Sequence, residues 1–458
     1  MAYRPDSEDI ARIVVGDLND PKKQNRALDI ATLANRPEVN IMVDGHAIVS
    51  RHLAILAMTG AGKSVTARRI IEELAKKNYP IVIFDPHGDY TGLGDVPNLK
   101  DKVQRFYAQF PLFEEDSETV AEIVSSLGYE LNPNMRTVFG DVFSVAKTYI
   151  DADNDEKNVR DEWLADFLSN SQLKSGGLNR DLWLVANLAE AAEISIRNKD
   201  KKSSEISDEQ QKLIDWGWEK LKNYSGTDAK TLEAIKKRVR RAASVLRRME
   251  TTNQKVAATS TALPNNRKDL VKYGQISVVS LAGYTSDFQA TIYSLIANEI
   301  FDARINGDLK LPVLFLLEEA HNFVPARGNS PAELRSIETT KQIAQEGRKF
   351  GVGLILISQR PSRLDETTLS QCNSFVIMRM VNPADQNFVR RVIESLGEDE
   401  AKNLPNLDVG EALLSGQMIN FPVLVKIKEP ESKGEREEKD AFVALQEAHD
   451  EMLKSQRK

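Results

Sequence analysis

The 458-residue sequence contains a single cysteine, Cys372. One cysteine cannot form a disulfide within the chain, which excludes an internal disulfide. No apolar run approaches the ~18 residues that a membrane span requires, so we expect no integral membrane protein. Residues 1–15, MAYRPDSEDIARIVV, lack the basic-then-apolar layout of a secretory signal. We therefore expect a cytoplasmic protein.

The chain also lacks an excess of positive charge, because 61 Lys and Arg face 68 Asp and Glu, for a net charge of −7. This balance predicts no global attraction to nucleic acid, although an acidic total can conceal a local basic groove. Hydrophobic residues at 41% and charged residues at 28% are typical of a soluble globular protein. The length allows at least one large core and about two to three domains.

Six apolar runs have the length of buried strands. They lie at residues 53–57, 81–84, 276–281, 313–317, 352–358 and 374–380. The first is followed by a Gly-rich turn and then by an amphipathic helix. Near-continuous apolar strands separated by helices indicate a parallel sheet that is covered on both faces. The sequence thus predicts an α/β core.

A stretch of about 170 residues separates the second predicted strand from the third, and it is mostly helical in pattern with polar connectors. We expect four parts: an N-terminal strap, an α/β core in two segments, a helical insertion and a charged C-terminal tail. The strap covers residues 1–50, the core residues 51–93 and 274–428, the insertion residues 94–273 and the tail residues 429–458. The charge run at 433–440 is predicted to be solvated. Two short strands are expected at 412–414 and 423–427.

One helix of the insertion combines an apolar stripe with a basic face. The stripe contains Ile235, Val239, Ala242, Leu246 and Met249, spaced to pack on neighbouring helices. The opposite face carries Lys236, Lys237, Arg238, Arg240, Arg241, Arg247 and Arg248. Such a face can follow DNA phosphates without reading the sequence, and the alternative is an ordinary solvated helix face.

The turn after the first strand has the pattern of a phosphate-binding loop. Its residues are Ala57, Met58, Thr59, Gly60, Ala61, Gly62, Lys63, Ser64 and then Val65, with alanine at 57 where glycine is usual. The glycines allow backbone N–H groups to surround a phosphate. Lys63 is predicted to reach the β- and γ-phosphates of ATP, and Ser64 to bind Mg²⁺ at the start of the helix. The alternative is an incidental glycine turn.

The apolar run 313–317 delivers two carboxylates, Glu318 and Glu319, to the carboxyl edge of the sheet, where α/β folds bind ligands. We expect Glu318 to hold Mg²⁺ through water, and Glu319 to polarise the water that attacks the γ-phosphate. The alternative is that both acids only begin a helix and complement its dipole.

Three further positions are candidates. Gln359 ends the strand 352–358 and could sense the γ-phosphate. Arg348 follows a helix and could be offered to the nucleotide of a neighbouring subunit, which accelerates hydrolysis in related chemistry. Asp85 or His87 could contact the metal, water or a neighbouring subunit. The alternatives are a strand-terminal polar residue for Gln359, a surface arginine for Arg348 and a plain turn for Asp85 and His87.

Several blocks, in this order, resemble the HerA branch of the HerA/FtsK superfamily of hexameric DNA-translocating ATPases. They are SRHLAILAMTGAGKS, IVIFDPHGDY, PVLFLLEEAHNFVP, IAQEGRKFGVGLILISQRPSRL and LPNLDVGEALLSG, within residues 32–92 and 274–427. The resemblance implies a RecA-like P-loop NTPase core with a mainly parallel sheet. It also implies a homohexameric ring that hydrolyses ATP with Mg²⁺ and moves double-stranded DNA, acting in DNA repair.

The resemblance assigns roles residue by residue. Lys63 and Ser64 match the phosphate and Mg²⁺ ligands, Glu318 and Glu319 the acidic pair, Gln359 the sensor and Arg348 the finger. Arg51 matches another arginine that the family uses near the nucleotide. The implied partner is a nuclease of the NurA type.

Two departures from the family pattern concern Ala57 and the N-terminus. Family members begin with a small β-barrel, whereas residues 1–31 are too short and too poor in alternating strands to form one. Either this end is trimmed or the protein works without the barrel. Two other functions stay open: a nucleotide-switched scaffold of an anti-phage defence complex with an effector enzyme, and a nucleotide-binding protein that hydrolyses little.

Overall fold

The computed structural model describes residues 9–456, except for 11–12, 15, 21, 110–111, 152–177, 199–207, 209–210, 212–227, 257–259, 395 and 434–440. Most of the charge run at 433–440 and parts of the predicted insertion therefore lie outside the described residues. The described part of the chain forms one sheet of 12 strands, in the order β2-β1-β12-β11-β10-β3-β9-β8-β4-β7-β5-β6. The strands are β1 (Ala27–Leu33), β2 (Arg36–Asp44), β3 (Leu53–Leu56), β4 (Ile81–Asp85), β5 (Val103–Tyr107), β6 (Thr261–Ala262), β7 (Ile276–Ser280), β8 (Val313–Leu317), β9 (Val352–Ser358), β10 (Ser374–Met378), β11 (Glu411–Gly416) and β12 (Val423–Ile427).

The predicted α/β fold with a mainly parallel sheet is confirmed. Strands β10, β3, β9, β8, β4, β7, β5 and β6 pair in parallel, and they include all six apolar runs singled out in the sequence. Antiparallel pairing joins β10 to β11, β11 to β12, β12 to β1 and β1 to β2. The sheet extends beyond the predicted core at both edges, since β1 and β2 come from the predicted strap and β5 and β6 from the predicted insertion.

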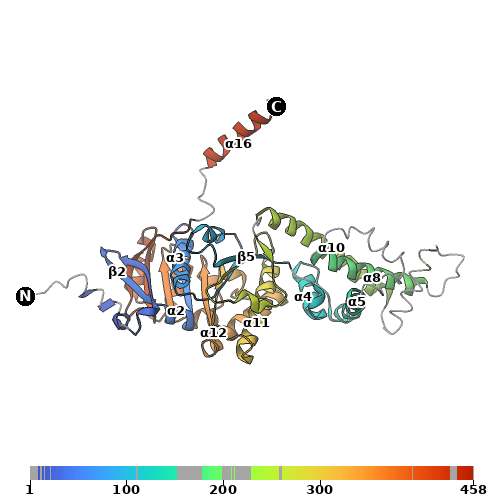
Figure 1. Ribbon diagram of the computed structural model, residues 1–458, viewed down its shortest axis with the longest axis horizontal. Helices are drawn as coiled ribbons and strands as arrows, with labels where there is room; N and C mark the ends of the chain where they lie inside the picture. Colours follow the sequence, from blue (N-terminus) through green and yellow to red (C-terminus); the bar gives the residue numbers. More distant parts are fainter. Residues whose placement is uncertain are drawn as a thin grey trace, which may run out of the picture.

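Helices lie on both faces of the sheet, and further helices lie beside it (Figure 1). They are α2 (Gly45–Arg51), α3 (Lys63–Lys76), α4 (Ser117–Ser126), α5 (Pro133–Asp151), α8 (Leu178–Asn198), α10 (Ala229–Val256), α11 (Ser286–Asn306), α12 (Pro331–Phe350), α13 (Glu366–Ser370), α14 (Pro383–Val392), α15 (Glu398–Asn403) and α16 (Ala441–Gln456). Helix α3 lies on one face of the sheet, and α11 and α12 lie on the other. None of the helices in the described part of the chain is long and apolar enough to cross a membrane.

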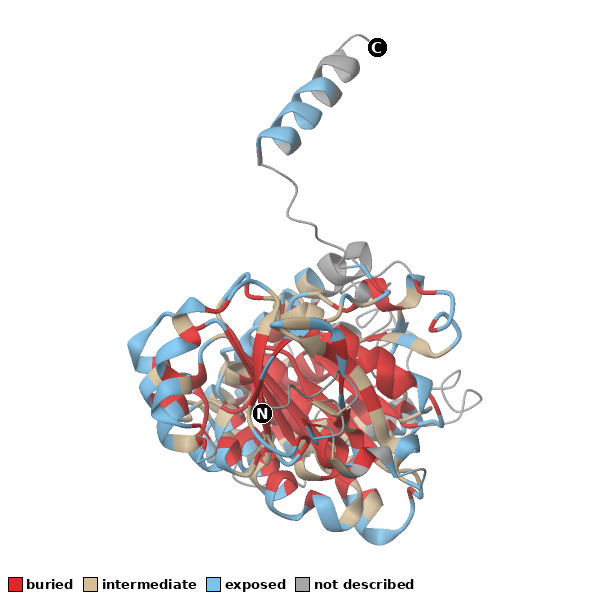
Figure 2. Cartoon of the chain, turned by 90° about the vertical axis from the view of Figure 1, so that its left-hand side faces the viewer, coloured by how far each residue is buried: buried red, intermediate tan, exposed pale blue. Residues whose placement is uncertain are grey.

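Two apolar cores lie on opposite faces of the sheet, because successive residues of a strand point in opposite directions. In β4, Ile81 and Ile83 belong to the core that contains the apolar side of α3. Val82 and Phe84 belong to the other core, where the ring of Phe84 lies 4.9 Å from the ring of Tyr293 in α11. The six central parallel strands, β10, β3, β9, β8, β4 and β7, are consequently buried on both sides (Figure 2).

Helices α4, α5, α8 and α10 form a separate group beside the sheet, and α8 packs along α10 (Figure 1). The predicted stripe of α10 is buried at Ile235, Val239, Ala242 and Leu246, with Met249 partly buried. Part of its basic face is neutralised by α8. Lys236 lies 2.6 Å from Glu193, and Arg240 pairs with Glu190 and stacks over the ring of Trp183. The basic side chains that the sequence singled out therefore do not form one continuous free face.

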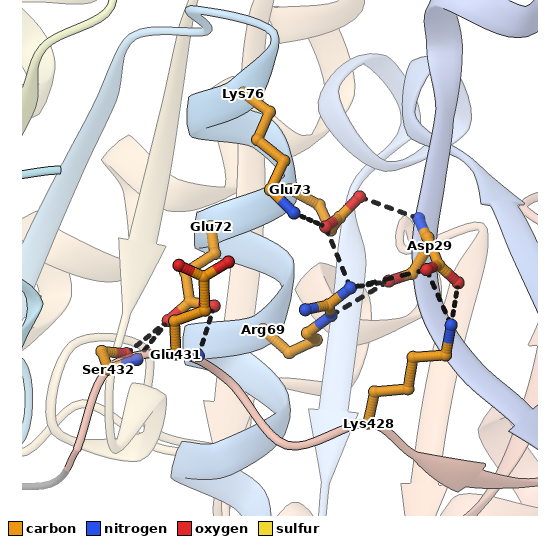
Figure 3. A network of polar contacts seen from close by, with 8 residues as sticks. All are labelled: Asp29, Arg69, Glu72, Glu73, Lys76, Lys428, Glu431 and Ser432. Carbon is orange, nitrogen blue, oxygen red and sulfur yellow. Dashed lines mark hydrogen bonds and ion pairs between the residues drawn. The ribbon is translucent and has the colours of Figure 1, made fainter. Parts of the chain in front are cut away.

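A polar network fixes the helix that follows the phosphate loop (Figure 3). On α3, Arg69 pairs with Glu73 at 3.0 Å and donates to the carbonyl oxygen of Asp29 in β1, and Lys428 after β12 binds the Asp29 carboxylate. Glu72, also on α3, accepts three hydrogen bonds: from the Glu431 N–H, from the Ser432 N–H and from the Ser432 hydroxyl. The network therefore joins α3 to β1 and to the segment after β12.

Candidate functional site

The phosphate-loop sequence forms the turn between β3 and α3, and Gly62 caps α3 at its N-terminus. Gly60 and Gly62 have positive φ of 79° and 107°, a conformation that favours glycine. At Gly62 a side chain would also lie 3.1 Å from Met378. The N–H of Ala57 donates to the Ser358 carbonyl, so this loop begins anchored to β9. Thr59 to Val65 thus have the backbone of an anion-binding turn at the start of a helix.

Lys63, Glu318 and Glu319 lie together at the carboxyl edge of the sheet. The Nζ atom of Lys63 lies 2.8 Å from Oε1 of Glu318 and also forms an ion pair with Oε1 of Glu319. The acids follow β8, which β9 separates from the loop-bearing strand β3. The order of the parallel strands brings together groups that are more than 250 positions apart in the sequence.

Glu319 has an unusual backbone for a non-glycine residue, with φ 49° and ψ 53°. Such a left-handed conformation costs on the order of 1–3 kcal/mol and is common at functional sites. The Glu319 side chain is buried, and its Oε2 atom lies 3.4 Å from Nδ1 of His321. The strained residue therefore directs a carboxylate toward Lys63 rather than toward solvent.

The carboxylates leave acceptor capacity that suits a hydrated magnesium ion and a water molecule. Oε1 of Glu318 and Oε2 of Glu319 are buried, and apart from Lys63 at 2.8 Å from the former and the His321 ring at 3.4 Å from the latter they have no polar partner among the described residues. Mg²⁺ prefers oxygen ligands, keeps several waters and is usually held by one or two carboxylates together with substrate phosphates. Ser64 supplies a hydroxyl in the first turn of α3. The donor set of Ser64 and Glu318 therefore fits Mg²⁺ bound to a nucleotide.

Burial and neighbouring charges shift the pKa values of the ionisable groups at this edge of the sheet. Burial raises the pKa of Glu318 to about 7, although Lys63 and a hydrogen bond from Tyr90 act in the opposite direction. Burial by itself would lower the pKa of Lys63, but the two carboxylates outweigh it and raise that pKa above its ordinary value. Burial lowers the pKa of His321. Ionising groups with opposed shifts in one place are typical of catalytic sites.

Other polar groups surround the acids. Thr59 of the loop donates to the amide oxygen of Gln359, so the structure brings the predicted sensor against the loop. The hydroxyl of Ser358 lies 3.4 Å from Nδ1 of His321. No role is predicted from the sequence for His321, Ser358 or Tyr90. All three residues lie in the sequence blocks quoted above, at the end of a buried strand or just after one. That position is the sequence signal that could have identified them.

Asp85 does not face the site directly. Its carboxylate is fully buried and accepts hydrogen bonds from the backbone N–H groups of residues 87–90. These bonds build the turn after β4, in agreement with the plain-turn alternative for Asp85.

Arg51 and Arg348 lie at the edge of the sheet formed by the amino ends of the parallel strands, opposite the carboxyl edge that carries the phosphate loop. Arg51 ends α2 just before β3. The exposed Arg348 lies in the last turn of α12, before β9, and not after the helix as predicted, because α12 continues to Phe350. His52 connects the two regions, because its Nδ1 atom accepts from the N–H of Leu354 and its Nε2 atom lies 3.0 Å from the Ala344 carbonyl of α12. The 7 residues of β9 span roughly 20 Å. The structure therefore does not bring either arginine to the phosphate loop of its own chain.

Comparison with known proteins gives one family match. The model described as "Helicase HerA, central domain" matches residues 28–300. The probable DNA double-strand break repair helicase HerA of Methanocaldococcus jannaschii is 29% identical, over 87% of this chain and 76% of the relative. The DNA double-strand break repair helicase HerA of Pyrococcus furiosus is 27% identical, over 92% of this chain and 71% of the relative. VirB4 of Thermoanaerobacter pseudethanolicus is 14% identical, over 88% of this chain and 96% of that structure, with a TM-score of 0.49.

Proposed function

Because the chain belongs to the HerA helicase family and is a P-loop ATP hydrolase, we propose that it uses ATP hydrolysis to move along double-stranded DNA. The observation that carries the proposal is the contact of Lys63 with both Glu318 and Glu319 beside a glycine loop at the start of a helix. A site of this type can hold phosphates, a metal and an attacking water at once.

Each residue of the site has a role in this proposal. The backbone of Thr59 to Val65 surrounds the phosphates of ATP, and Lys63 neutralises their charge. Ser64 and Glu318 hold Mg²⁺, which supplies charge stabilisation for the transferred phosphoryl group. Glu319 accepts a proton from the attacking water, and its oxygen without a hydrogen bond is the atom suited to that task. Gln359, already in contact with the loop, senses the γ-phosphate.

Arg51 and Arg348 complete the site of a neighbouring subunit in this proposal. Their position at the edge opposite the phosphate loop supports action between subunits, because a side chain cannot cross the length of β9 to reach its own nucleotide. The arrangement proposed is a homohexameric ring around duplex DNA. The division into four parts predicted from sequence belongs to the same proposal, with β1 and β2 of the strap and β5 and β6 of the insertion joining the sheet of the core. A cytoplasmic location is also part of it.

Subunit mixing tests the shared site. Arg348→Ala and Lys63→Ala proteins, each inactive alone, are co-expressed with different tags and purified as mixed assemblies. We expect ATP turnover to return, because some interfaces then combine an intact Lys63 with an intact Arg348. Exchange of the neighbouring exposed Lys349 for alanine is the matched control and keeps full activity. Mixed assemblies without activity, or a chain that stays monomeric with ATP and DNA by mass measurement, would contradict the ring.

Steady-state ATP turnover with linear duplex DNA tests the substrate. We expect duplex to stimulate turnover, Lys63→Ala to abolish it, and Lys77→Ala at the exposed end of α3 to leave it unchanged. Turnover that ignores DNA of every form and length would refute the motor. We also propose a partner nuclease of the NurA type, since relatives are named for double-strand break repair. Co-purification with an effector other than a nuclease would instead favour the defence complex.

A further inference from the structure

The turn after β4 holds a tyrosine in one orientation. The carboxylate of Asp85 accepts hydrogen bonds from the N–H groups of His87, Gly88 and Asp89 through Oδ1, and from that of Tyr90 through Oδ2. Gly88 takes a positive φ of 86°, which the tight turn requires. A buried carboxylate with four backbone donors fixes the segment, and with it the start of the Tyr90 side chain.

Tyr90 reaches the acidic edge of the neighbouring strand. Strands β4 and β8 pair in parallel, with Phe84 opposite Leu317, so the turn after β4 lies next to Glu318. The hydroxyl group of Tyr90 donates to Oε2 of Glu318 at 2.5 Å. Both side chains are fully buried, so water does not compete for this hydrogen bond. Hydrogen bonds to a charged acceptor are stronger than those between neutral groups.

The hydrogen bond leaves the two oxygens of Glu318 in different surroundings. Oε2 is held by Tyr90, whereas Oε1 pairs with the ammonium group of Lys63 at 2.8 Å and has no other hydrogen-bond donor among the described residues. A carboxylate with one oxygen fixed cannot rotate freely about its terminal torsion, which is otherwise broad. Oε1 is consequently the oxygen turned toward the phosphate loop.

We propose that Tyr90 is a positioning residue that holds Glu318 so that one carboxylate oxygen faces the nucleotide-bound Mg²⁺. The inference rests on the proposed role of Glu318 as a metal ligand. Tyr90 itself touches neither nucleotide nor metal. It acts through the carboxylate, much as the outer partners of metal ligands orient those ligands in other proteins.

A matched control is present in the apolar core on the other face of the sheet. Tyr293 is also fully buried, packs edge-on against Phe84, and has one side-chain partner for its hydroxyl group, Thr340 at 3.0 Å. Its hydroxyl does not contact the acidic pair. Either Tyr→Phe substitution removes one buried hydroxyl group and its hydrogen bond from an apolar core. An effect on Mg²⁺ binding that is specific to Tyr90→Phe therefore reports positioning rather than packing.

The experiment measures how much Mg²⁺ tightens binding of a fluorescent ATP analogue, by titration in MgCl₂ and in EDTA. Wild type and Tyr293→Phe are expected to show the same Mg²⁺-dependent gain, and Glu318→Gln to lose it. For Tyr90→Phe we expect the Mg²⁺-dependent gain in affinity to be about tenfold smaller, which corresponds to about 1.4 kcal/mol. Its affinity for the analogue in EDTA is expected to stay unchanged. Gly88→Ala keeps the hydroxyl but strains the turn, and we expect a smaller loss in the same direction.

The outcomes separate the two levels of the proposal. If Glu318→Gln keeps the full Mg²⁺-dependent gain, the role of Glu318 fails and the inference falls with it. If Glu318→Gln loses the gain while Tyr90→Phe and Gly88→Ala both keep it, only the inference about Tyr90 is overturned. Should Tyr90→Phe not fold, Gly88→Ala alone decides. A Tyr293→Phe protein with the same loss as Tyr90→Phe would assign the effect to packing and also overturn it.

Discussion

Replacing Glu318 by glutamine is expected to stabilise the protein when nucleotide and metal are withheld. Burial raises the pKa of this carboxyl from 4.5 to about 7, which means that the folded chain resists its ionisation. At about 1.36 kcal/mol per pKa unit, the ionised carboxylate costs about 3 kcal/mol of folding free energy. Glutamine is neutral at every pH and avoids this cost. Since the folded pKa is the higher one, the cost begins near pH 4.5 and is complete above about pH 7.

Thermal unfolding in EDTA measures this effect. For a chain of 458 residues, about 3 kcal/mol corresponds to a rise in Tm of about 3 °C at pH 8, with almost no difference at pH 4.5. The exposed Glu338 of α12 provides the matched control, because Glu338→Gln is expected to change Tm at neither pH. A Glu318→Gln protein that is less stable than wild type at pH 8, or a difference that does not depend on pH, would refute the reasoning.

Three further substitutions test other parts of the structure. Glu319→Gln is expected to reduce ATP turnover at least a hundredfold while nucleotide affinity changes little, because a general base contributes about 10²- to 10⁴-fold to rate; turnover near the wild-type rate would contradict that role. Glu72→Gln weakens three hydrogen bonds from residues 431–432, so we expect it to lower the free energy of unfolding, measured in urea, by about 1–3 kcal/mol. Ser432→Ala is expected to lower it by about 1 kcal/mol. If both variants were as stable as wild type, the segment after β12 would not hold α3.

Much of the core could be predicted because its strands are short apolar runs bounded by turn residues. All six runs became strands with ends within two residues of those predicted, and β3 ends at Leu56 rather than at residue 57. The meeting of the acids with the loop followed from a general rule, since parallel strands present their carboxyl ends at one edge. The resemblance to the HerA branch, based on five blocks, is confirmed by the family match.

Other features depended on tertiary structure. Strands β1 and β5 contain polar or charged residues and lack the continuous apolar pattern of the central strands, so they were not predicted. The left-handed backbone of Glu319 has no sequence signature in a non-glycine residue. The hydrogen bond from Tyr90 to Glu318 joins residues 228 positions apart, and the bond from Ser432 to Glu72 joins residues 360 positions apart. Such contacts require knowledge of which strands are neighbours.

Displacement of a third DNA strand tests the central claim most directly, because it reports movement along duplex rather than hydrolysis alone. A fluorescent oligonucleotide is bound as a triplex at the end of a linear duplex, and its release is followed after ATP and Mg²⁺ are added. We expect wild type to release the third strand, and Glu319→Gln to bind the duplex without releasing it. ATP turnover stimulated by the same duplex, with the third strand left in place, would contradict an ATP-driven translocase.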